Sequence, residues 1–508
     1  MSSISSSRPL GNLELFFKKL ADSGSPLGRE HWAVHLALTL RIKDHADLLP
    51  YLQNTWLAIR REHPAIGSII KPPAEVPEAK EHANDPTREV LTIPALDAVR
   101  WGRETFFVHE NEKDADGLFS GLQPTPTATC HWLPQSSTLI IRSSHWRLDG
   151  IGIIKLGHVF LTTLAETLQM KAEDFQTIES TKERSSITTL PPNLERLAQI
   201  WRQTQGLAAA SSQNERQVLT DRLDAGADAL VGEFLRGVPS IGLPNLPDTA
   251  TTLPGASARV ETKLDISMTA KITKARRAMN LSFTGAVHAA IVRVTARYPQ
   301  HPLAKSYAAF FPVDLRQSIL AAGAASEEEL MFGLYFSGLP VCINGMIPED
   351  DGSGETKGFK EIAREMTAVY SRDLTAFWNA PDGHQVSLME LAEPYLKKTT
   401  VLFNTPVPEG LPLTQTPDLS GLGKVETFLQ REYQSTSEHH APKVEVADVW
   451  VGTEIINRCV QFHVWSWRDE FRLGVSFNKS FYEKTFVANL LDQVVEELLT
   501  GLDVHRYS

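Results

Sequence analysis

The sequence predicts an α/β protein made of two lobes, each a two-layer α+β arrangement of a sheet and helices. Its 508 residues are too many for one small core and indicate two or three domains. Strand-like and helix-like patterns occur on both sides of a segment, 238–255, that is rich in proline and glycine. Because such a composition is typical of a linker, we predict an N-terminal lobe over 1–237, a linker over 238–255 and a C-terminal lobe over 256–508.

The composition limits the class of protein. Apolar residues make up 42% of the chain and charged residues 22%, which is ordinary for a soluble globular protein. The formal net charge of -11 argues against a nucleic-acid partner, because phosphates require a basic surface. No apolar run approaches the roughly twenty residues that span a bilayer, and no secretory signal is visible. Cys130, Cys342 and Cys459 are too widely spaced for a zinc site. We expect a cytoplasmic monomer without a metal cofactor.

The elements of the N-terminal lobe are predicted from apolar periodicity and from breaking residues. A short amphipathic piece lies at 13–20. The helix that follows Gly152 is predicted because its apolar residues recur at a spacing of three and four. Residues 171–237 are mostly polar and helix-like. The other predicted elements are a strand at 31–42, a helix at 46–62, short strands near 89–92 and 104–108, and a strand at 138–142.

The C-terminal lobe also mixes both kinds of element. Alternating residues predict its first strand, and a proline after the second helix marks a helix end. The tail alternates strand and turn before a final amphipathic helix. The predicted elements are strands at 258–264, 306–312, 332–343, 444–452, 460–467 and 471–477, and helices at 267–279, 284–298, 357–377 and 484–499.

The stretch with the clearest chemistry is SSHWRLDG at 143–150. It lies between the strand at 138–142 and the helix after Gly152, so His145 is expected on a loop held by rigid elements. An imidazole in such a place is the commonest general base near neutral pH. A structural histidine is the alternative, since about one chain of this composition in twenty contains His-x-x-x-Asp-Gly by chance. The chain has no phosphate loop and no Gly-x-Ser-x-Gly nucleophile elbow, which disfavours nucleotide and serine-hydrolase chemistry.

The hexapeptide His145–Gly150 resembles the His-x-x-x-Asp-Gly signature of the coenzyme A-dependent acyltransferases. This superfamily includes chloramphenicol acetyltransferase, the plant BAHD enzymes and peptide-synthetase condensation domains. Residues 277–290, the strand end Pro312–Arg316 and residues 473–482 are similar to parts of the second lobe of these proteins. Residues 451–454 and 464–467 favour the fungal branch typified by trichothecene 15-O-acetyltransferase.

The resemblance implies a chloramphenicol acetyltransferase-like pseudo-dimer of two lobes with a central channel. It implies that His145 is the catalytic base and that Asp149, before Gly150, pairs with an arginine and shapes the loop. Arg316 and Arg61 are candidates for that arginine.

The reaction also needs donors for an oxyanion and, for coenzyme A, a basic cluster. The oxyanion and substrate candidates are Trp146, Ser466 and Asn478. The candidate coenzyme A residues are Lys274, Arg276 and Arg277, although such a charge run is also typical of a solvated helix face.

The predicted function is transfer of an acyl group, with acetyl favoured, from acyl-CoA to a hydroxyl of an apolar secondary metabolite. His145 acts as general base, and no covalent enzyme intermediate forms because no nucleophile lies beside it. One alternative is a thioester donor carried by an acyl carrier protein, so that a polyketide is offloaded or esterified. Another is a binding or pericyclase-like protein that keeps the fold without acyl transfer.

Overall fold

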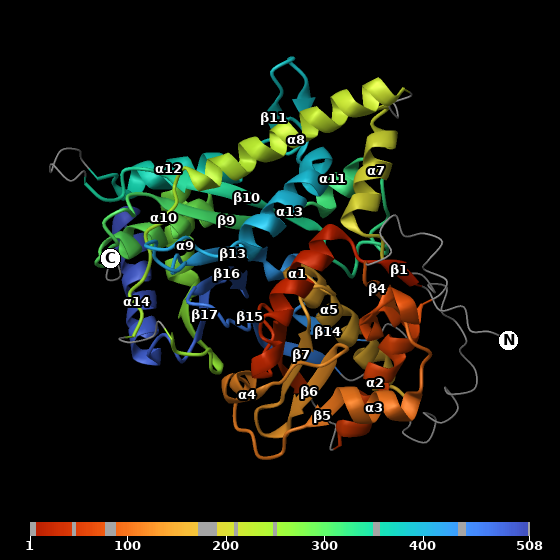
Figure 1. The fold of residues 1–508 in the computed structure, drawn as a ribbon. Coiled ribbons are helices and arrows are strands. Elements are labelled where there is room, and N and C mark those ends of the chain that lie inside the picture. Colours follow the sequence, from red (N-terminus) through yellow and green to blue (C-terminus); the bar gives the residue numbers. More distant parts are fainter. Residues whose placement is uncertain are drawn as a thin grey trace. The chain divides into compact units, whose positions relative to one another are not determined.

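The chain forms two compact units (Figure 1), and the computed structural model describes residues 7–42, 47–76, 88–170, 190–207, 212–246, 251–348, 356–434 and 443–505. Unit 1 comprises Met1–Asn193, Glu327–Leu334 and Val425–Thr453. Unit 2 comprises Leu194–Ser326, Tyr335–Lys424 and Glu454–Ser508. Among the described residues, no helix is both long and apolar enough to cross a membrane.

The division differs from the lobes predicted from the sequence. The first segment of unit 1 ends at Asn193 and not at 237, because the helices α7 (Leu194–Thr204) and α8 (Gln213–Leu235) pack on α13 (Leu388–Asn404). Unit 1 also takes in two segments from the second half of the chain. A division based on composition alone assigns each segment to the lobe that is nearest in sequence. It therefore misses segments of the second half of the chain that pack with the first half.

The predicted linker 238–255 is bound along unit 2. The N–H of Ile241 donates to the carbonyl of Ser306, and the N–H of Leu243 donates to that of Gln415. The N–H of Leu246 donates to the carbonyl of Phe481. Residues 247–250 lie outside the described part. The proline- and glycine-rich segment is therefore irregular in structure, but it is hydrogen-bonded to unit 2.

A mixed sheet with the order β14–β15–β2–β7–β6–β5 organises unit 1. A smaller sheet has the order β1–β4–β3. The strands of unit 1 are β1 (Ser7–Pro9), β2 (Val34–Ile42), β3 (Ile69–Lys71), β4 (Val90–Thr92), β5 (Phe106–Val108), β6 (Thr129–Leu133), β7 (Thr138–Ser143), β14 (Glu432–Tyr433) and β15 (Val444–Thr453). Its helices are α1 (Asn12–Asp22), α2 (Leu49–Glu62), α3 (Ala98–Thr105), α4 (Ala115–Gly121) and α5 (Gly150–Thr167).

Helix α5 packs against α2 and against strand β2. Its apolar stripe, with Ile153, Leu156 and Phe160 among its members, is fully buried. A side chain at Gly157 would overlap Cδ2 of Leu36 on β2, so the glycine lets the helix approach the sheet closely. This packing fixes the N-terminus of α5, the end that follows the His-x-x-x-Asp-Gly loop.

The two late segments complete unit 1. Strand β15 pairs antiparallel with β2, from Val444 opposite Ile42 to Thr453 opposite Val34. The segment 327–334 buries Leu330, Phe332 and Leu334. The apolar residues that predicted a strand from 332 are thus buried as a loop, and the strand β10 begins only at Phe336.

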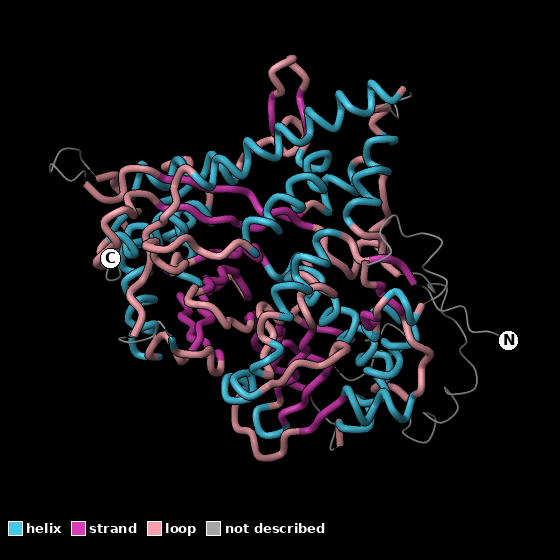
Figure 2. Tube along the Cα trace, viewed as in Figure 1, coloured by secondary structure: helices cyan, strands magenta, loops and turns pink. Residues whose placement is uncertain are grey.

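Unit 2 contains a sheet with the order β13–β16–β17–β8 and an antiparallel pair, β9 and β10. Its strands are β8 (Ser257–Leu264), β9 (Tyr307–Asp314), β10 (Phe336–Ile343), β11 (Trp378–Asn379), β12 (Gln385–Val386), β13 (Asp418–Lys424), β16 (Gln461–Trp467) and β17 (Glu470–Asn478). Its other helices are α9 (Ile266–Ala278), α10 (Phe283–Ala296), α11 (Arg316–Ala321), α12 (Phe359–Tyr370) and α14 (Lys484–Gly501). Figure 2 distinguishes the helices from the strands along the trace by colour.

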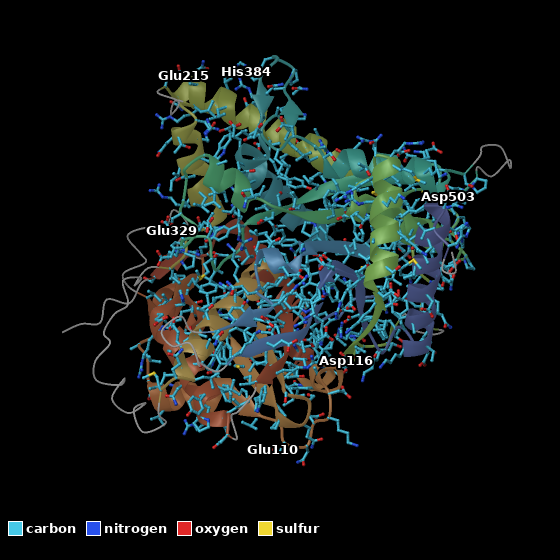
Figure 3. The ribbon with its side chains drawn as sticks, turned by 180° about the vertical axis from the view of Figure 1, so that it is seen from behind. Glu110, Asp116, Glu215, Glu329, His384 and Asp503 are labelled. Atoms are coloured by element: carbon cyan, nitrogen blue, oxygen red, sulfur yellow. The ribbon has the colours of Figure 1, made fainter. Side chains whose placement is uncertain are left out.

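A short hairpin, β11–β12, stands out beside the long helix α8 (Figure 1). Asp382 in its turn accepts a 2.7 Å hydrogen bond from Arg222 of α8. Figure 3 labels His384 on the hairpin and Glu215 at the start of α8. The ion pair therefore ties the hairpin to the helix at the surface of unit 2.

Most predicted elements are confirmed with small shifts of their ends. The strands at 138–142 and 444–452 are β7 and β15, and the final helix is α14. The helix predicted over 357–377 ends at Tyr370, and Asp373 beyond it accepts hydrogen bonds from the N–H and hydroxyl of Thr375. Within 171–237, residues 171–189 and 208–211 lie outside the described part. Helix α13 is not predicted from the sequence, and its Pro394 is a residue typical of a helix break.

Candidate active site

His145 lies in the turn between β7 and α5, as the sequence predicts. The turn is held by the N–H groups of Arg147 and Leu148, which both donate to the carbonyl of Ser144. Strand β7 is buried along its whole length, and α5 has a buried face. The predicted position of His145 on a turn between a strand and a helix is therefore confirmed, and its catalytic role stays a prediction.

Asp149 begins the helix that follows. Its Oδ1 accepts a 2.7 Å hydrogen bond from the N–H of Gly152, so Asp149 is the N-cap of α5. Its own N–H donates to the carbonyl of Gly333, in the segment that returns from the second half of the chain. Asp149 thus holds the start of α5 as a helix cap. Gly150 is the first residue of the helix.

The imidazole of His145 lies face to face with the phenyl ring of Phe17 on α1. Their ring centroids are 4.0 Å apart and the planes differ by 5°. Although His145 keeps part of its surface exposed, burial lowers its pKa to about 4, while the negative charges of Asp149 and Glu30 act in the opposite direction. The ring is therefore neutral at pH 7 and able to accept a proton.

A buried ion pair lies close to His145 in sequence. Arg142, the residue before the last of β7, is fully buried and donates a 2.5 Å hydrogen bond to Glu30. Its other terminal nitrogen donates to the hydroxyl of Thr125. Neither Glu30 nor Phe17 is predicted from the sequence. An arginine within an apolar strand is the one sequence signal, because a buried charge requires a partner.

Trp146 and Arg147 pack on each other. The guanidinium of Arg147 lies 4.2 Å from the centroid of the Trp146 ring and donates to the carbonyls of Ser68 and Pro126. Burial lowers the pKa of Arg147 to about 9. Trp146 itself is buried, so the pair stabilises the loop that carries His145.

The two arginines predicted to pair with Asp149 belong to different units. Arg61 lies near the end of α2 in unit 1. Arg316 begins α11 in unit 2, where it donates to Asp314 at 2.9 Å and lies over the ring of Tyr335. Asp314 and Arg316, at the end of strand β9, thus form an ion pair with each other within unit 2. The pairing of either arginine with Asp149 stays a prediction.

Asn478 has a structural role at the end of β17. Its amide nitrogen donates to the carbonyls of Gly255 and Ile455, and its oxygen accepts from the N–H groups of Gly255 and Ser480. Both amide hydrogens are therefore used within the protein, which corrects the interpretation of Asn478 as an oxyanion donor. Ser466 is half-buried in β16, opposite Phe471 of β17.

The predicted coenzyme A residues lie on the last turns of α9. Lys274 and Arg277 are exposed. Arg276 is half-buried, donates to the carbonyl of Leu281 and lies over the Phe283 ring. Lys274 and Arg277 therefore remain available to an anionic group, whereas Arg276 closes the end of its own helix. In the described part of the chain, no group of three or more His, Cys, Asp or Glu side chains is placed to hold a metal ion.

Comparison with solved structures shows which proteins share this fold. The trichothecene 15-O-acetyltransferase TRI3 of Fusarium sporotrichioides superposes with a TM-score of 0.71 at 16% identity, over 98% of this chain and 96% of that chain. The condensation domain of the Monacolin K polyketide synthase MokA gives a TM-score of 0.56 at 13% identity, over 99% and 98% of the two chains. This chain therefore has the fold that the acetyltransferase and the condensation domain share, as the motif predicts.

The sequence relatives are fungal. The chain is 28% identical over 503 residues to the loline biosynthesis cluster 1 transcription factor lolU1 of Epichloe uncinata, covering 97% of this chain and 94% of that protein. It is also 28% identical over 505 residues to the acetyltransferase pigO of Monascus ruber, covering 98% and 96%. No protein-family model matches. The predicted likeness to fungal acetyltransferases of secondary metabolism is confirmed.

Proposed function

We propose that this protein is an O-acyltransferase in which His145 is the general base. The observation that carries the proposal is the neutral imidazole fixed on the loop between β7 and α5, with burial lowering its pKa to about 4. The acetyltransferase name of a relative aligned over nearly the whole chain supports the same reaction. The donor is acyl-CoA, with acetyl favoured, and the acceptor is a hydroxyl of an apolar secondary metabolite.

In the proposed reaction, His145 takes the proton of the acceptor hydroxyl as the oxygen attacks the thioester carbonyl carbon. A C–O bond forms and the carbonyl oxygen becomes an oxyanion. The intermediate collapses with cleavage of the C–S bond, and the imidazolium returns the proton to the departing thiolate. The products are the ester and the free thiol, and His145 is neutral again.

Formation of the imidazolium is the demanding step, because burial opposes a charged ring. The carboxylates of Asp149 and Glu30 favour the charged form. Their negative charges therefore stabilise the state that His145 reaches during proton transfer. The exposed cations Lys274 and Arg277 of α9 are suited to the phosphates of coenzyme A, and we assign them to that role within the proposal.

Nucleic-acid binding is the function suggested by the name of the lolU1 relative. The net charge of -11 disfavours it, because binding to DNA depends largely on positive charge that neutralises phosphates. A catalytic role also explains the half-buried, neutral imidazole on this turn, which a DNA-binding surface does not require.

The test is thioester consumption with acetyl-CoA and a panel of apolar alcohols. His145→Ala is expected to reduce kcat by about 100-fold or more, the range for loss of a general base. His158→Ala is the matched control, because His158 lies on the following helix and is hydrogen-bonded to Tyr433, and it should retain activity. Equal rates for wild type and His145→Ala would overturn the proposal. If turnover occurred only with a carrier-protein thioester, His145 would remain the proposed base, but the proposed acyl donor would have to be changed.

A further inference from the structure

The face of the His145 imidazole is covered by a residue from the start of the chain. The ring centroids of His145 and Phe17 are 4.0 Å apart with nearly parallel planes. Most aromatic pairs have centroids about 4.5–7 Å apart, offset or edge to face. The contact is therefore close, and it restricts rotation of the imidazole out of its plane.

Phe17 is itself held on more than one side. It is 5% exposed and lies on the buried face of α1. The ring of Trp32 lies 5.7 Å away at an angle of 51°. Phe16 packs edge-on against it at 5.1 Å. The phenyl ring can therefore transmit a fixed orientation to the histidine.

Trp32 has an unusual backbone conformation, with φ of 60°. A bulky side chain rarely adopts this left-handed region, and such strain persists only where the surrounding structure enforces it. The turn that contains it is closed by a hydrogen bond from the N–H of Ala33 to the carbonyl of Glu30. The side chain of Glu30 is in turn paired with the buried Arg142.

These contacts connect His145 and Phe17 by a second route, through Arg142, Glu30 and Trp32. Arg142 lies three residues before His145 on the same strand and turn. The side chain of Arg142 is joined to Glu30 by the buried ion pair. From Glu30 the route continues through the strained turn to Trp32, and from there through ring contacts to Phe17 and back to His145. A strained residue and a buried ion pair both contribute to one aromatic contact on the proposed base.

We propose that Phe17 is a positioning residue for His145: its ring fixes the plane of the imidazole and stabilises the imidazolium that forms during acyl transfer. The inference rests on the proposed function. The face of a phenyl ring carries a negative quadrupole and attracts a cation that lies over it. The phenyl ring therefore acts in the same direction as the carboxylates of Asp149 and Glu30, and its effect appears in the transition state more than in substrate binding.

The experiment compares Phe17→Leu, which keeps apolar bulk without a ring, with Phe17→Tyr, which keeps the ring. Leu13→Ala is the control, because Leu13 is buried on the same helix one turn earlier and cannot stack on the imidazole. We expect Phe17→Leu to lower kcat by about threefold to thirtyfold with little change in KM, the range for a cation–π contact. Phe17→Tyr should restore kcat, and Leu13→Ala should leave it within about twofold.

A second measurement does not depend on turnover. The imidazole is stacked on the Phe17 ring, so the NMR signal of the Cε1–H proton of His145 should carry an upfield ring-current shift. This shift should disappear in Phe17→Leu and persist in Phe17→Tyr and Leu13→Ala. Unchanged kcat in a folded Phe17→Leu protein, together with an inactive His145→Ala, would overturn the inference and leave the proposed function intact. An active His145→Ala would instead overturn the proposed function, and an unchanged His145 signal in Phe17→Leu would separately exclude the stack.

Discussion

The N–H of Gly152 donates a 2.7 Å hydrogen bond to Oδ1 of Asp149, so the aspartate of the motif caps the helix that begins at Gly150. The spacing of the motif explains this contact. A capping side chain accepts from an N–H two or three residues into the helix, and Gly152 is the third helical residue. The Asp-Gly part of the signature therefore fixes the start of α5, and with it the turn that holds His145.

Replacement of Asp149 tests the cap. Asp149→Ala should lower the free energy of unfolding by about 1–2 kcal/mol, because the first turn of α5 loses its acceptor. Asp149→Asn keeps an oxygen that can accept from Gly152 and should retain more of the stability. Urea denaturation of both variants measures the difference. Equal losses in the two variants would show that the charge of Asp149, and not the cap, dominates.

The sequence predicts those parts of the site that are local in the chain. His145, Asp149 and Gly150 lie within one strand–turn–helix unit, whose two periodicities are both visible in the residues. The strand of 138–142 and the helix after Gly152 are found as β7 and α5. Local signals therefore suffice to place the proposed base on its loop.

The contacts that orient His145 could not be predicted in the same way. Phe17 is only one apolar residue of a short amphipathic helix, and nothing in its neighbourhood in sequence points to a histidine 128 positions away. The carbonyl of Gly333 that binds the N–H of Asp149 comes from a segment between two elements of unit 2. Such contacts depend on which distant segments of the chain pack together, and the periodicity of apolar residues does not show this.

The pH dependence of activity follows from the burial of His145. The proposed base works in its neutral form, and burial lowers its pKa to about 4. As the pH falls, kcat/KM should therefore remain on a plateau through pH 6.5 and decrease only near pH 4. A pH–rate profile with a stable acyl-CoA donor measures this limb. An acid limb near 6.5, the ordinary value for histidine, would mean that the imidazole is solvated in the working enzyme.

Replacement by alanine should have opposite effects on the free energy of unfolding at two glycines that lie on different helices. A Cβ at Gly157 of α5 would overlap Leu36, whereas a Cβ at Gly232 of α8 would meet nothing within 4 Å. Gly157→Ala should therefore cost about 1–3 kcal/mol through overpacking. Gly232→Ala should gain about 0.4–1 kcal/mol, because alanine restricts the unfolded chain. Urea denaturation of both variants tests the close approach of α5 to β2, and a neutral Gly157→Ala would contradict it.

A buried histidine in unit 2 gives the last prediction. His288 is fully buried on α10, with Nδ1 3.0 Å from the hydroxyl of Tyr370 and Nε2 2.7 Å from that of Tyr307. The hydroxyl of Tyr307 donates to the carbonyl of Pro417, so its oxygen must accept from Nε2–H. Nδ1 then accepts from Tyr370, and the neutral ring satisfies both contacts. Protonation would give Nδ1 a hydrogen that opposes this arrangement.

Burial lowers the pKa of His288 to about 3, whereas an unfolded chain has a histidine pKa of about 6.5. Between these values the unfolded state binds the proton and the folded state does not. The contribution to stability is therefore complete above pH 6.5 and is lost as the pH falls toward 3. From pH 7.5 to 5.0 the loss from this one group is about 2 kcal/mol.

His288→Gln can still donate and accept hydrogen bonds but does not titrate. The variant should be less stable than wild type at pH 7.5, because its amide fits the two hydroxyls less well. Between pH 7.5 and 5.0, however, its free energy of unfolding should fall by about 2 kcal/mol less than that of wild type. Urea denaturation at the two pH values measures both quantities. Parallel losses in the two proteins would mean that His288 can take up a proton in the folded state, which the two tyrosine contacts oppose.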